Sequence, residues 1–205
     1  KHNNMKKVII ALVTAIAVGC MAMVQPAKAG GVYDGVAPGS SIVGVRLGLS
    51  NIVGVNATYD YALARVWKGT FTIGGQVGYM WEGNSRTETL YGVKSKVKYS
   101  NNYIDIKVRT TYRFNVVVPE WEVYAGVGIG GYVNPYVSKA TLKGDVAGES
   151  VNTKEKSHGV HGGVSGAFIL GTSYQFTDAM AATLEFDMGN LWEQSWVNLG
   201  INFKF

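Results

Sequence analysis

The last nine residues constrain the fold of this chain more than any other segment. From Val197 to Phe205 apolar and polar side chains alternate without a break, and the segment ends on an aromatic residue. Neighbouring side chains of a β-strand point to opposite faces, so this segment has one wholly apolar face and one polar face. The pattern predicts an amphipathic strand, and its apolar face needs a surrounding that excludes water.

The other end of the chain has the pattern of an export signal. Met5-Lys6-Lys7 is a positive n-region, Val8 to Val18 an apolar h-region, and Ala27-Lys28-Ala29 a small-x-small cleavage site. We therefore expect residues 1–29 to be a signal peptide, with residues 1–4 upstream of its natural start, and residues 30–205 to form one mature domain.

Two other interpretations of this segment are open. An uncleaved membrane helix is disfavoured because Val8 to Val24 is shorter than the about 20 residues that span a bilayer, and Gln25-Pro26 ends the run. Lipidation of Cys20 would follow from a lipobox-like context, although Ala17 stands where such boxes usually carry Leu. Cleavage after Ala29 accounts best for the pattern.

Loss of the leader would change the charge balance of the chain. Four lysines leave with it, so 19 basic residues become 15 against 14 acidic ones, and the net charge falls from +5 to +1. A nearly neutral domain gives no indication of nucleic-acid binding. The only cysteine, Cys20, also lies in the leader, so we expect the mature chain to have neither a disulfide nor thiol chemistry.

The mature chain has a two-residue hydrophobic period and no convincing helical one. Candidate strands are residues 42–49, 55–63, 71–81, 103–114, 121–132, 164–176, 180–188 and 197–205. Eight is an even number, as bacterial single-chain barrels require, and several strands reach the roughly 9 to 11 residues that cross a membrane when tilted. The sequence therefore predicts an all-β fold, an eight-stranded antiparallel transmembrane β-barrel preceded by a cleavable signal peptide.

A soluble β-sandwich would also give short alternating strands, so the placement of aromatic residues and loops decides between the two folds. With a periplasmic N-terminus, the aromatic residues at one membrane level form an interfacial girdle. They are Tyr61, Phe71, Tyr112, Phe114, Trp121, Tyr174, Phe176, Phe203 and Phe205. The inner turns 115–120 and 177–179 are short, whereas the outer loops 82–102 and 133–163 are long and polar. This asymmetry is typical of outer-membrane barrels.

On these eight strands and the terminal Phe205, the chain resembles the small eight-stranded outer-membrane proteins of the OmpA/OmpX/Opa type, the general outer-membrane β-barrel family. The resemblance covers essentially the whole mature chain. It implies the outer membrane of a Gram-negative bacterium and insertion by the outer-membrane assembly machinery, with Phe203 and Phe205 as the assembly signal. The roles that it implies range from envelope integrity to adhesion.

Strand parity places ten charged side chains inside the predicted barrel, five of each sign. The basic ones are Arg46, Lys107, Arg109, Arg113 and Lys204, and the acidic ones are Asp60, Asp105, Glu122, Glu185 and Asp187. An eight-stranded barrel is only wide enough for side chains, and an unpaired charge inside it would be costly. We therefore expect a salt-bridge network, with Arg113 and Glu122 as its first pair, rather than an ion pathway.

Motifs for a cofactor or for catalysis are weak in this sequence. Gly126 to Gly131 matches GxGxxG, but it lies within a strand, where a dinucleotide site needs a helix N-terminus. A lipid A-modifying enzyme would draw on His158, His161, Ser165, Glu185 and Asp187. His161 and Ser165, however, would be about 13 Å apart on a strand, and His158 and His161 differ in parity and could not share a metal. We expect no catalytic, cofactor or metal site.

These observations together predict a monomeric, non-enzymatic outer-membrane barrel that acts through its two long loops. The expected partners are membrane lipid, lipopolysaccharide and a host or surface ligand; a lipid A-modifying enzyme and a narrow channel for small solutes are the alternatives. Lys94, Lys96 and Lys98 share the parity of the outward face. Two interpretations of these lysines are open: contact with the phosphates of lipopolysaccharide, or a solvated loop edge; a bulge at Asn101-Asn102 would reverse their parity.

Overall fold

The computed structural model describes residues 36–49, 53–90, 93–116, 118–146, 149–189 and 194–205. The predicted leader, residues 1–29, lies outside them. The strands are β1 (Ser41–Leu49), β2 (Val53–Val66), β3 (Gly69–Leu90), β4 (Val93–Asn115), β5 (Trp121–Val146), β6 (Glu149–Thr177), β7 (Met180–Gly189) and β8 (Gln194–Lys204). Each strand pairs antiparallel with the next, and β1 pairs with β8, so the sheet closes. The predicted eight-stranded antiparallel barrel is confirmed.

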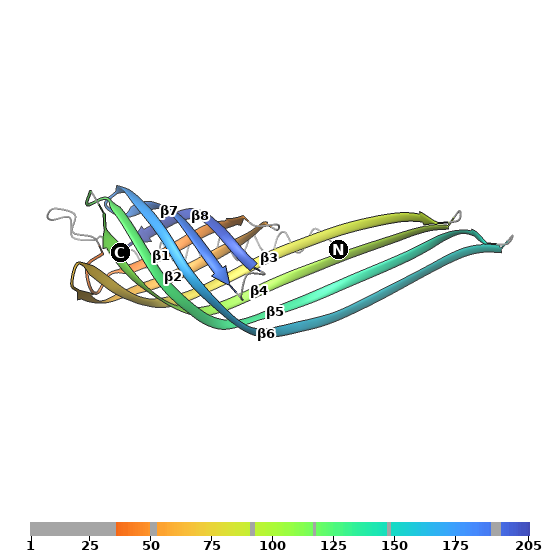
Figure 1. Ribbon diagram of the computed structural model, residues 1–205, viewed down its shortest axis with the longest axis horizontal. Helices are drawn as coiled ribbons and strands as arrows, with labels where there is room; N and C mark the ends of the chain where they lie inside the picture. Colours follow the sequence, from red (N-terminus) through yellow and green to blue (C-terminus); the bar gives the residue numbers. More distant parts are fainter. Residues whose placement is uncertain (1–35, 50–52, 91–92, 117, 147–148, 190–193) are drawn as a thin grey trace.

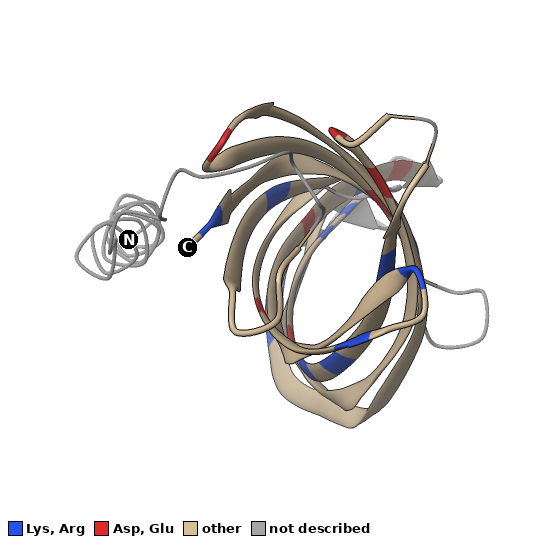
Figure 2. Ribbon diagram, turned by 90° about the vertical axis from the view of Figure 1, so that its left-hand side faces the viewer, with Lys and Arg blue, Asp and Glu red and all other residues tan. Residues whose placement is uncertain are grey.

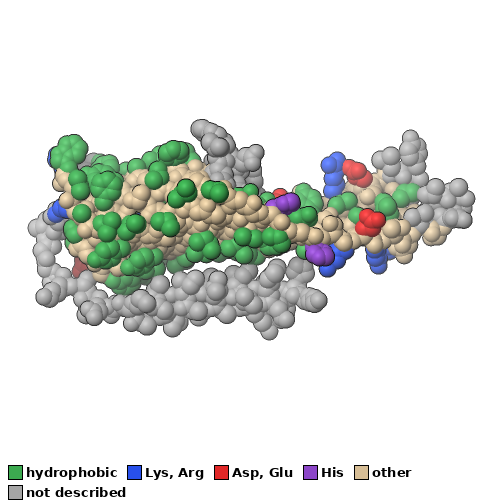
Figure 3. All heavy atoms as spheres, turned by 90° about the horizontal axis from the view of Figure 1, so that it is seen from below, with side chains coloured by type: hydrophobic (Ala, Val, Ile, Leu, Met, Phe, Trp, Pro, Cys, Tyr) green, Lys and Arg blue, Asp and Glu red, His purple; other side chains and the backbone are tan. Residues whose placement is uncertain are grey.

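The two-residue period divides every strand between the lumen and the outer surface. On β4, Ile106 and Val108 are 59% and 60% exposed, whereas Asp105, Lys107 and Arg109 between and beside them are buried. Exposed large hydrophobic side chains occur on all eight strands. They are spread along the face of the barrel that Figure 3 shows. An apolar outer wall around a polar interior is the arrangement that a bilayer requires of a barrel.

The predicted aromatic girdle lies at the end of the barrel where the turns are short. Tyr112 packs between Phe71 and Phe114, with ring centroids 5.0 and 6.1 Å away. Its hydroxyl donates to the carbonyl of Val66 at 2.9 Å, and the indole of Trp121 donates to the Thr172 hydroxyl at 2.6 Å. Tyr112 and Trp121 therefore keep an apolar ring on the outer surface while their polar groups are hydrogen-bonded within the wall, as side chains at a membrane interface do.

At the same end, the described part of the segment that leads into β1 packs against the lumen side chains. Val36 is buried against Ile42 and Ala62, both of which point into the lumen. The Thr70 hydroxyl donates to the carbonyl of Val36 at 2.7 Å, and the amide of Gly39 donates to Ala62 at 2.8 Å. These contacts hold the segment against the inward-facing side chains at this end of the barrel.

The two long connections are not loops, and this part of the sequence prediction was wrong. Residues 82–90 and 93–102 extend β3 and β4 and remain paired up to Leu90 and Val93. Residues 133–146 and 149–163 extend β5 and β6 and remain paired up to Val146 and Glu149. The prediction relied on apolar and polar alternation, which stops where both faces become polar. Cross-strand hydrogen bonding continues without it.

The four long strands project well beyond their neighbours as two adjacent hairpins (Figure 1). The last pair between β2 and β3 is Gly54 with Met80, and the last between β6 and β7 is Ala167 with Gly189. Beyond these points β4 still pairs with β5, from Asn101 opposite Tyr136 to Lys94 opposite Lys143. The two hairpins therefore form one four-stranded sheet, the projecting sheet, comprising residues 81–90, 93–102, 134–146 and 149–161.

Candidate functional site

The lumen contains an unbroken chain of six buried charges that alternate in sign. Its order is Arg46, Glu185, Arg109, Asp60, Arg113 and Glu122, from strands β1, β7, β4, β2, β4 and β5. Arg109 lies 2.7 Å from Glu185 and 3.2 Å from Asp60, and Arg113 lies 2.9 Å from Asp60 and 3.0 Å from Glu122. Each inner charge of the chain has an opposite charge on both sides, which offsets its desolvation.

A second, smaller group of charges lies further toward the projecting sheet. Lys107 contacts Asp105 at 2.6 Å and Asp187 at 3.5 Å. Gln76 joins this group to the first, because its amide nitrogen donates to Asp187 at 2.9 Å and its oxygen accepts from Arg109 at 3.1 Å. Lys204 donates to Gln175 at 2.9 Å and interacts electrostatically with Glu122 of the first group. Burial, hydrogen bonds and parity therefore place all ten of the predicted charged residues in the lumen. Figure 2, which looks along the barrel, shows basic and acidic positions on the strands that surround it.

Sequence reasoning missed the neutral residues that tie these charges together. The Tyr124 hydroxyl donates to Glu185 at 2.9 Å, and the guanidinium of Arg113 lies 4.2 Å from the centre of the Tyr124 ring. A side chain at Gly171 would collide with the Tyr124 ring, so the glycine leaves that space to the tyrosine. Tyr124 has the same parity as Glu122, which is the signal that would have found it.

A cavity between described lumen side chains is too small for solutes. It is bounded by Asn56, Asp105, Lys107, Ser165 and Asp187 among others and has a volume of about 10 Å³. That is at most room for one water molecule. The side chains, rather than solvent, fill the barrel at this level.

The catalytic candidates do not converge in the structure. His161 stacks on Tyr136 with ring centroids 5.0 Å apart, while Ser165 is buried four residues further along β6, about 13 Å away on an extended strand. His158 differs from His161 in parity and lies on the other face of the sheet. Glu185 and Asp187 are held in the ion pairs of the lumen.

No cluster of metal-binding side chains occurs among the residues that the structure describes. The glycine-rich segment Gly126 to Gly131 lies inside β5, paired with both neighbouring strands. The described ranges contain no helix with the length and hydrophobicity that spanning a membrane requires.

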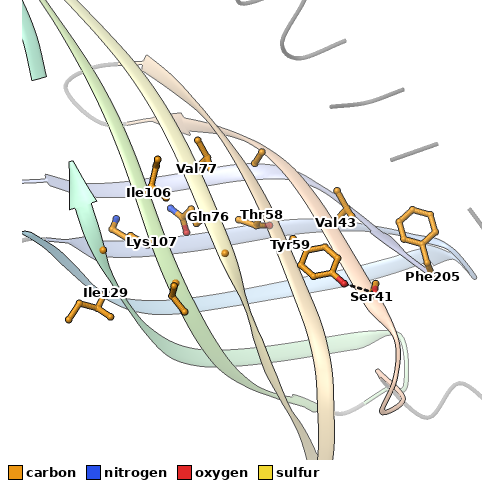
Figure 4. Close-up of a pocket in the computed structure, with 14 residues that line it drawn as sticks. Ser41, Val43, Thr58, Tyr59, Gln76, Val77, Ile106, Lys107, Ile129 and Phe205 are labelled. Carbon is orange, nitrogen blue, oxygen red and sulfur yellow. Dashed lines mark hydrogen bonds between the residues drawn. The ribbon is translucent and has the colours of Figure 1, made fainter. Parts of the chain in front are cut away.

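The outer wall has a hollow of about 1000 Å³ across strands β1 to β5. Val43, Tyr59, Val77, Ile106 and Ile129 lie around it, and the Ser41 hydroxyl is 3.0 Å from the Tyr59 hydroxyl at one end (Figure 4). These are outward-facing residues of the apolar wall. The lining of the hollow is almost entirely apolar, which is the character of the lipid-facing wall of a transmembrane barrel.

Lys94, Lys96 and Lys98 lie on the outward face of the projecting sheet. All three are exposed, and the residues between them point to the other face. The register between β3 and β4 runs from Gly69–Phe114 to Leu90–Val93 without a shift. Because no bulge occurs at Asn101-Asn102, the outward parity of Ile104 carries through to the three lysines.

Comparison with known proteins agrees with this architecture. Residues 10–205 match the family model described as the outer membrane protein beta-barrel domain. The chain belongs to this family. The family places it in the outer membrane of Gram-negative bacteria, and no curated protein gives a significant match to the chain.

Several solved structures are similar to this chain at low identity. The attachment invasion locus protein Ail of Yersinia pestis, in a phospholipid bilayer nanodisc, is 15% identical with a TM-score of 0.45, covering 82% of this chain and 99% of that one. The N-terminal β-barrel domain of Pseudomonas aeruginosa OprF is 14% identical with a TM-score of 0.44, covering 82% and 98%. Neisserial surface protein A is 13% identical with a TM-score of 0.34, covering 81% and 95%.

Proposed function

We propose that this protein is a monomeric, non-enzymatic barrel of the outer membrane that presents the projecting sheet to partners at the cell surface. Its leader would export it, and the assembly machinery would insert it by way of Phe203 and Phe205. One observation carries the proposal. The lumen is filled by paired charges, while the four long strands continue beyond the barrel as a paired sheet with exposed side chains on both faces.

The filled lumen argues against a channel for solutes. A path through the barrel would have to break the alternating charge chain, in which Arg46, Arg109 and Glu185 are at most 1% exposed. Breaking such pairs leaves uncompensated buried charges, which is strongly unfavourable. The closed barrel instead serves as a rigid base for the sheet.

The arrangement of nucleophile and base argues against a lipid A-modifying enzyme. A serine hydrolase needs its base within hydrogen-bond reach of the hydroxyl, and His161 is too far along the strand from Ser165. Mass spectrometry of lipid A from cells with and without the gene tests this point. We expect identical lipid A, and an acyl chain gained or lost only in the presence of the gene would establish an enzyme.

Trimming the projecting sheet tests the proposal directly. Asn84 faces Tyr99 and Ser138 faces Ser157, so residues 85–98 and 139–156 can each be replaced by an Asn-Gly turn between paired positions. We expect the trimmed barrel to reach the membrane in normal amounts. Cells that produce it should nevertheless match gene-deletion cells in detergent sensitivity and in adhesion to surfaces. Trimmed cells that match cells with the whole chain in both assays would contradict the proposal.

A further inference from the structure

The outward face of the projecting sheet carries seven exposed lysines in three adjacent rows. The register aligns Lys98, Lys139 and Lys156 in the row nearest the barrel, Lys96 and Lys154 in the middle row, and Lys94 and Lys143 in the outer row. We call these seven residues the lysine face. None of the ion pairs between side chains that the structure describes involves these seven residues.

Within the three lysine rows no acidic residue shares the face of the lysines; Asp145 has the same parity but lies one outward position beyond Lys143, outside the rows. Glu82, Glu88 and Glu155 have the opposite parity to the lysines and lie on the other face, where Glu88 pairs with Arg86 at 2.7 Å. In the three lysine rows, β3 contributes only Ser85, Thr87 and Thr89. Sequence alone hides this arrangement, because Glu155 stands between Lys154 and Lys156 in the chain.

The lysine rows contain like charges directly opposite one another. Lys94 faces Lys143, and Lys139 faces Lys98 on one side and Lys156 on the other. Directly opposed side chains on neighbouring strands are about 5 Å apart, and like charges there destabilise the sheet. A sheet under selection for stability alone would alternate the signs. An anionic partner would remove this repulsion.

On β5 the lysine face directly continues the lipid-facing wall. On β5 the outward residues Val133 and Val137 are followed at the next outward position by Lys139. Successive outward positions are about 7 Å apart along a strand, so with a tilt of about 40° the lysines of β5 lie about 5 to 15 Å above the last apolar residue. A lipid molecule packed against this wall would present its head group to these lysines.

We propose that the lysine face binds the phosphate groups of the lipopolysaccharide that surrounds the barrel in its own membrane leaflet. The inference rests on the proposed function and names the ligand of the projecting sheet. Each ammonium group has three donors and acts as a point charge suited to phosphate. The face forms a grid of about 5 by 7 Å, so one phosphate can contact lysines of two strands. Acyl chains on the apolar wall and phosphates on the lysine face would then belong to the same molecules.

The test compares charge removal with charge retention in one row. Three variants of the full chain are purified. The Gln variant combines Lys98→Gln, Lys139→Gln and Lys156→Gln, and the Arg variant changes the same three residues to Arg. The control variant combines Lys68→Gln and Arg86→Gln, which remove cations outside the lysine face. Affinity is measured in phosphatidylcholine nanodiscs that contain phosphorylated or dephosphorylated lipopolysaccharide. We expect the Gln variant to bind phosphorylated lipopolysaccharide at least about tenfold more weakly than the unaltered protein, since several cations act together. The Arg and control variants should stay within about twofold.

Thermal unfolding in pure phosphatidylcholine nanodiscs separates ligand binding from folding. There the Gln variant should be at least as stable as the unaltered chain, because the like-charge repulsion is gone. Equal affinity of the unaltered and Gln proteins, equal affinity for both lipopolysaccharides, or a less stable Gln variant would each overturn the proposal. Binding of inorganic polyphosphate without binding of lipopolysaccharide would also overturn it and point to a soluble polyanion. None of these results bears on the phenotype of the trimmed sheet, so the proposed function is judged separately.

Discussion

Glu185 is the residue on which the charge chain of the lumen depends most. It accepts hydrogen bonds from Arg46, from both terminal nitrogens of Arg109 at 3.2 and 2.7 Å, and from Tyr124 at 2.9 Å, and it is completely buried. The change Glu185→Gln keeps the size of the side chain but leaves two buried guanidinium groups short of a counter-charge. Breaking a buried pair on one side costs about 3–5 kcal/mol, so the free energy of unfolding should fall by about that amount.

The measurement is reversible urea unfolding of the barrel in lipid vesicles, followed by tryptophan fluorescence. Glu88→Gln is the matched control, since its ion pair with Arg86 at 2.7 Å is largely exposed and should contribute less than about 1 kcal/mol. Adding Arg46→Met to Glu185→Gln should restore part of the loss, because it removes one of the stranded charges. A Glu185→Gln protein within about 1 kcal/mol of the unaltered chain would show that the lumen charges are not coupled as the distances indicate.

Three further outcomes follow from the closed barrel. The folded protein should resist SDS without heating and migrate differently after boiling, because a closed sheet has no free edge within the membrane; identical migration of both samples would contradict this. Deleting Phe205, or changing it to Lys, should reduce the amount in the outer membrane, as quantified by fractionation, since an interfacial aromatic is lost from the closing strand; unchanged amounts would remove the assembly role. Purified protein in planar bilayers should give no stable large conductance steps, whereas frequent uniform steps of porin size would show an open lumen.

The sequence predicted the barrel part of the fold because lipid imposes its own pattern there. The first residues of β5 and β7, Trp121 and Met180, were predicted correctly, and so was the inner or outer placement of the charged residues on the barrel strands. Each barrel strand must place an apolar side chain outward at every second position, so a two-residue period is unavoidable. That period fixes parity, and parity places charges such as Arg109 and Glu185 in the lumen.

The projecting sheet could not be predicted in the same way, because no bilayer surrounds it. From Glu82 to Leu90 both faces of β3 are mostly polar, so its continuation depends only on hydrogen bonds to β4. Most ion-pair partners within the lumen could not be predicted from the sequence either. Arg113 and Glu122 are adjacent through a turn and could be expected as a pair, whereas Arg46 and Glu185 meet only because β7, β8 and β1 lie side by side in the closed sheet. The lysine face could not be predicted either, because it depends on the register of three strands, which the sequence of a single strand does not give.

The most direct test of the account is the sidedness of two engineered cysteines in living cells. Ser85→Cys lies on the exposed projecting sheet and Lys68→Cys in the short turn between β2 and β3 at the opposite end, each combined with Cys20→Ser. A membrane-impermeant maleimide should label the cysteine at position 85 in intact cells, and the one at position 68 only after the outer membrane is opened. Labelling of position 68 in intact cells, or protection of position 85, would contradict a barrel that presents its long strands at the cell surface.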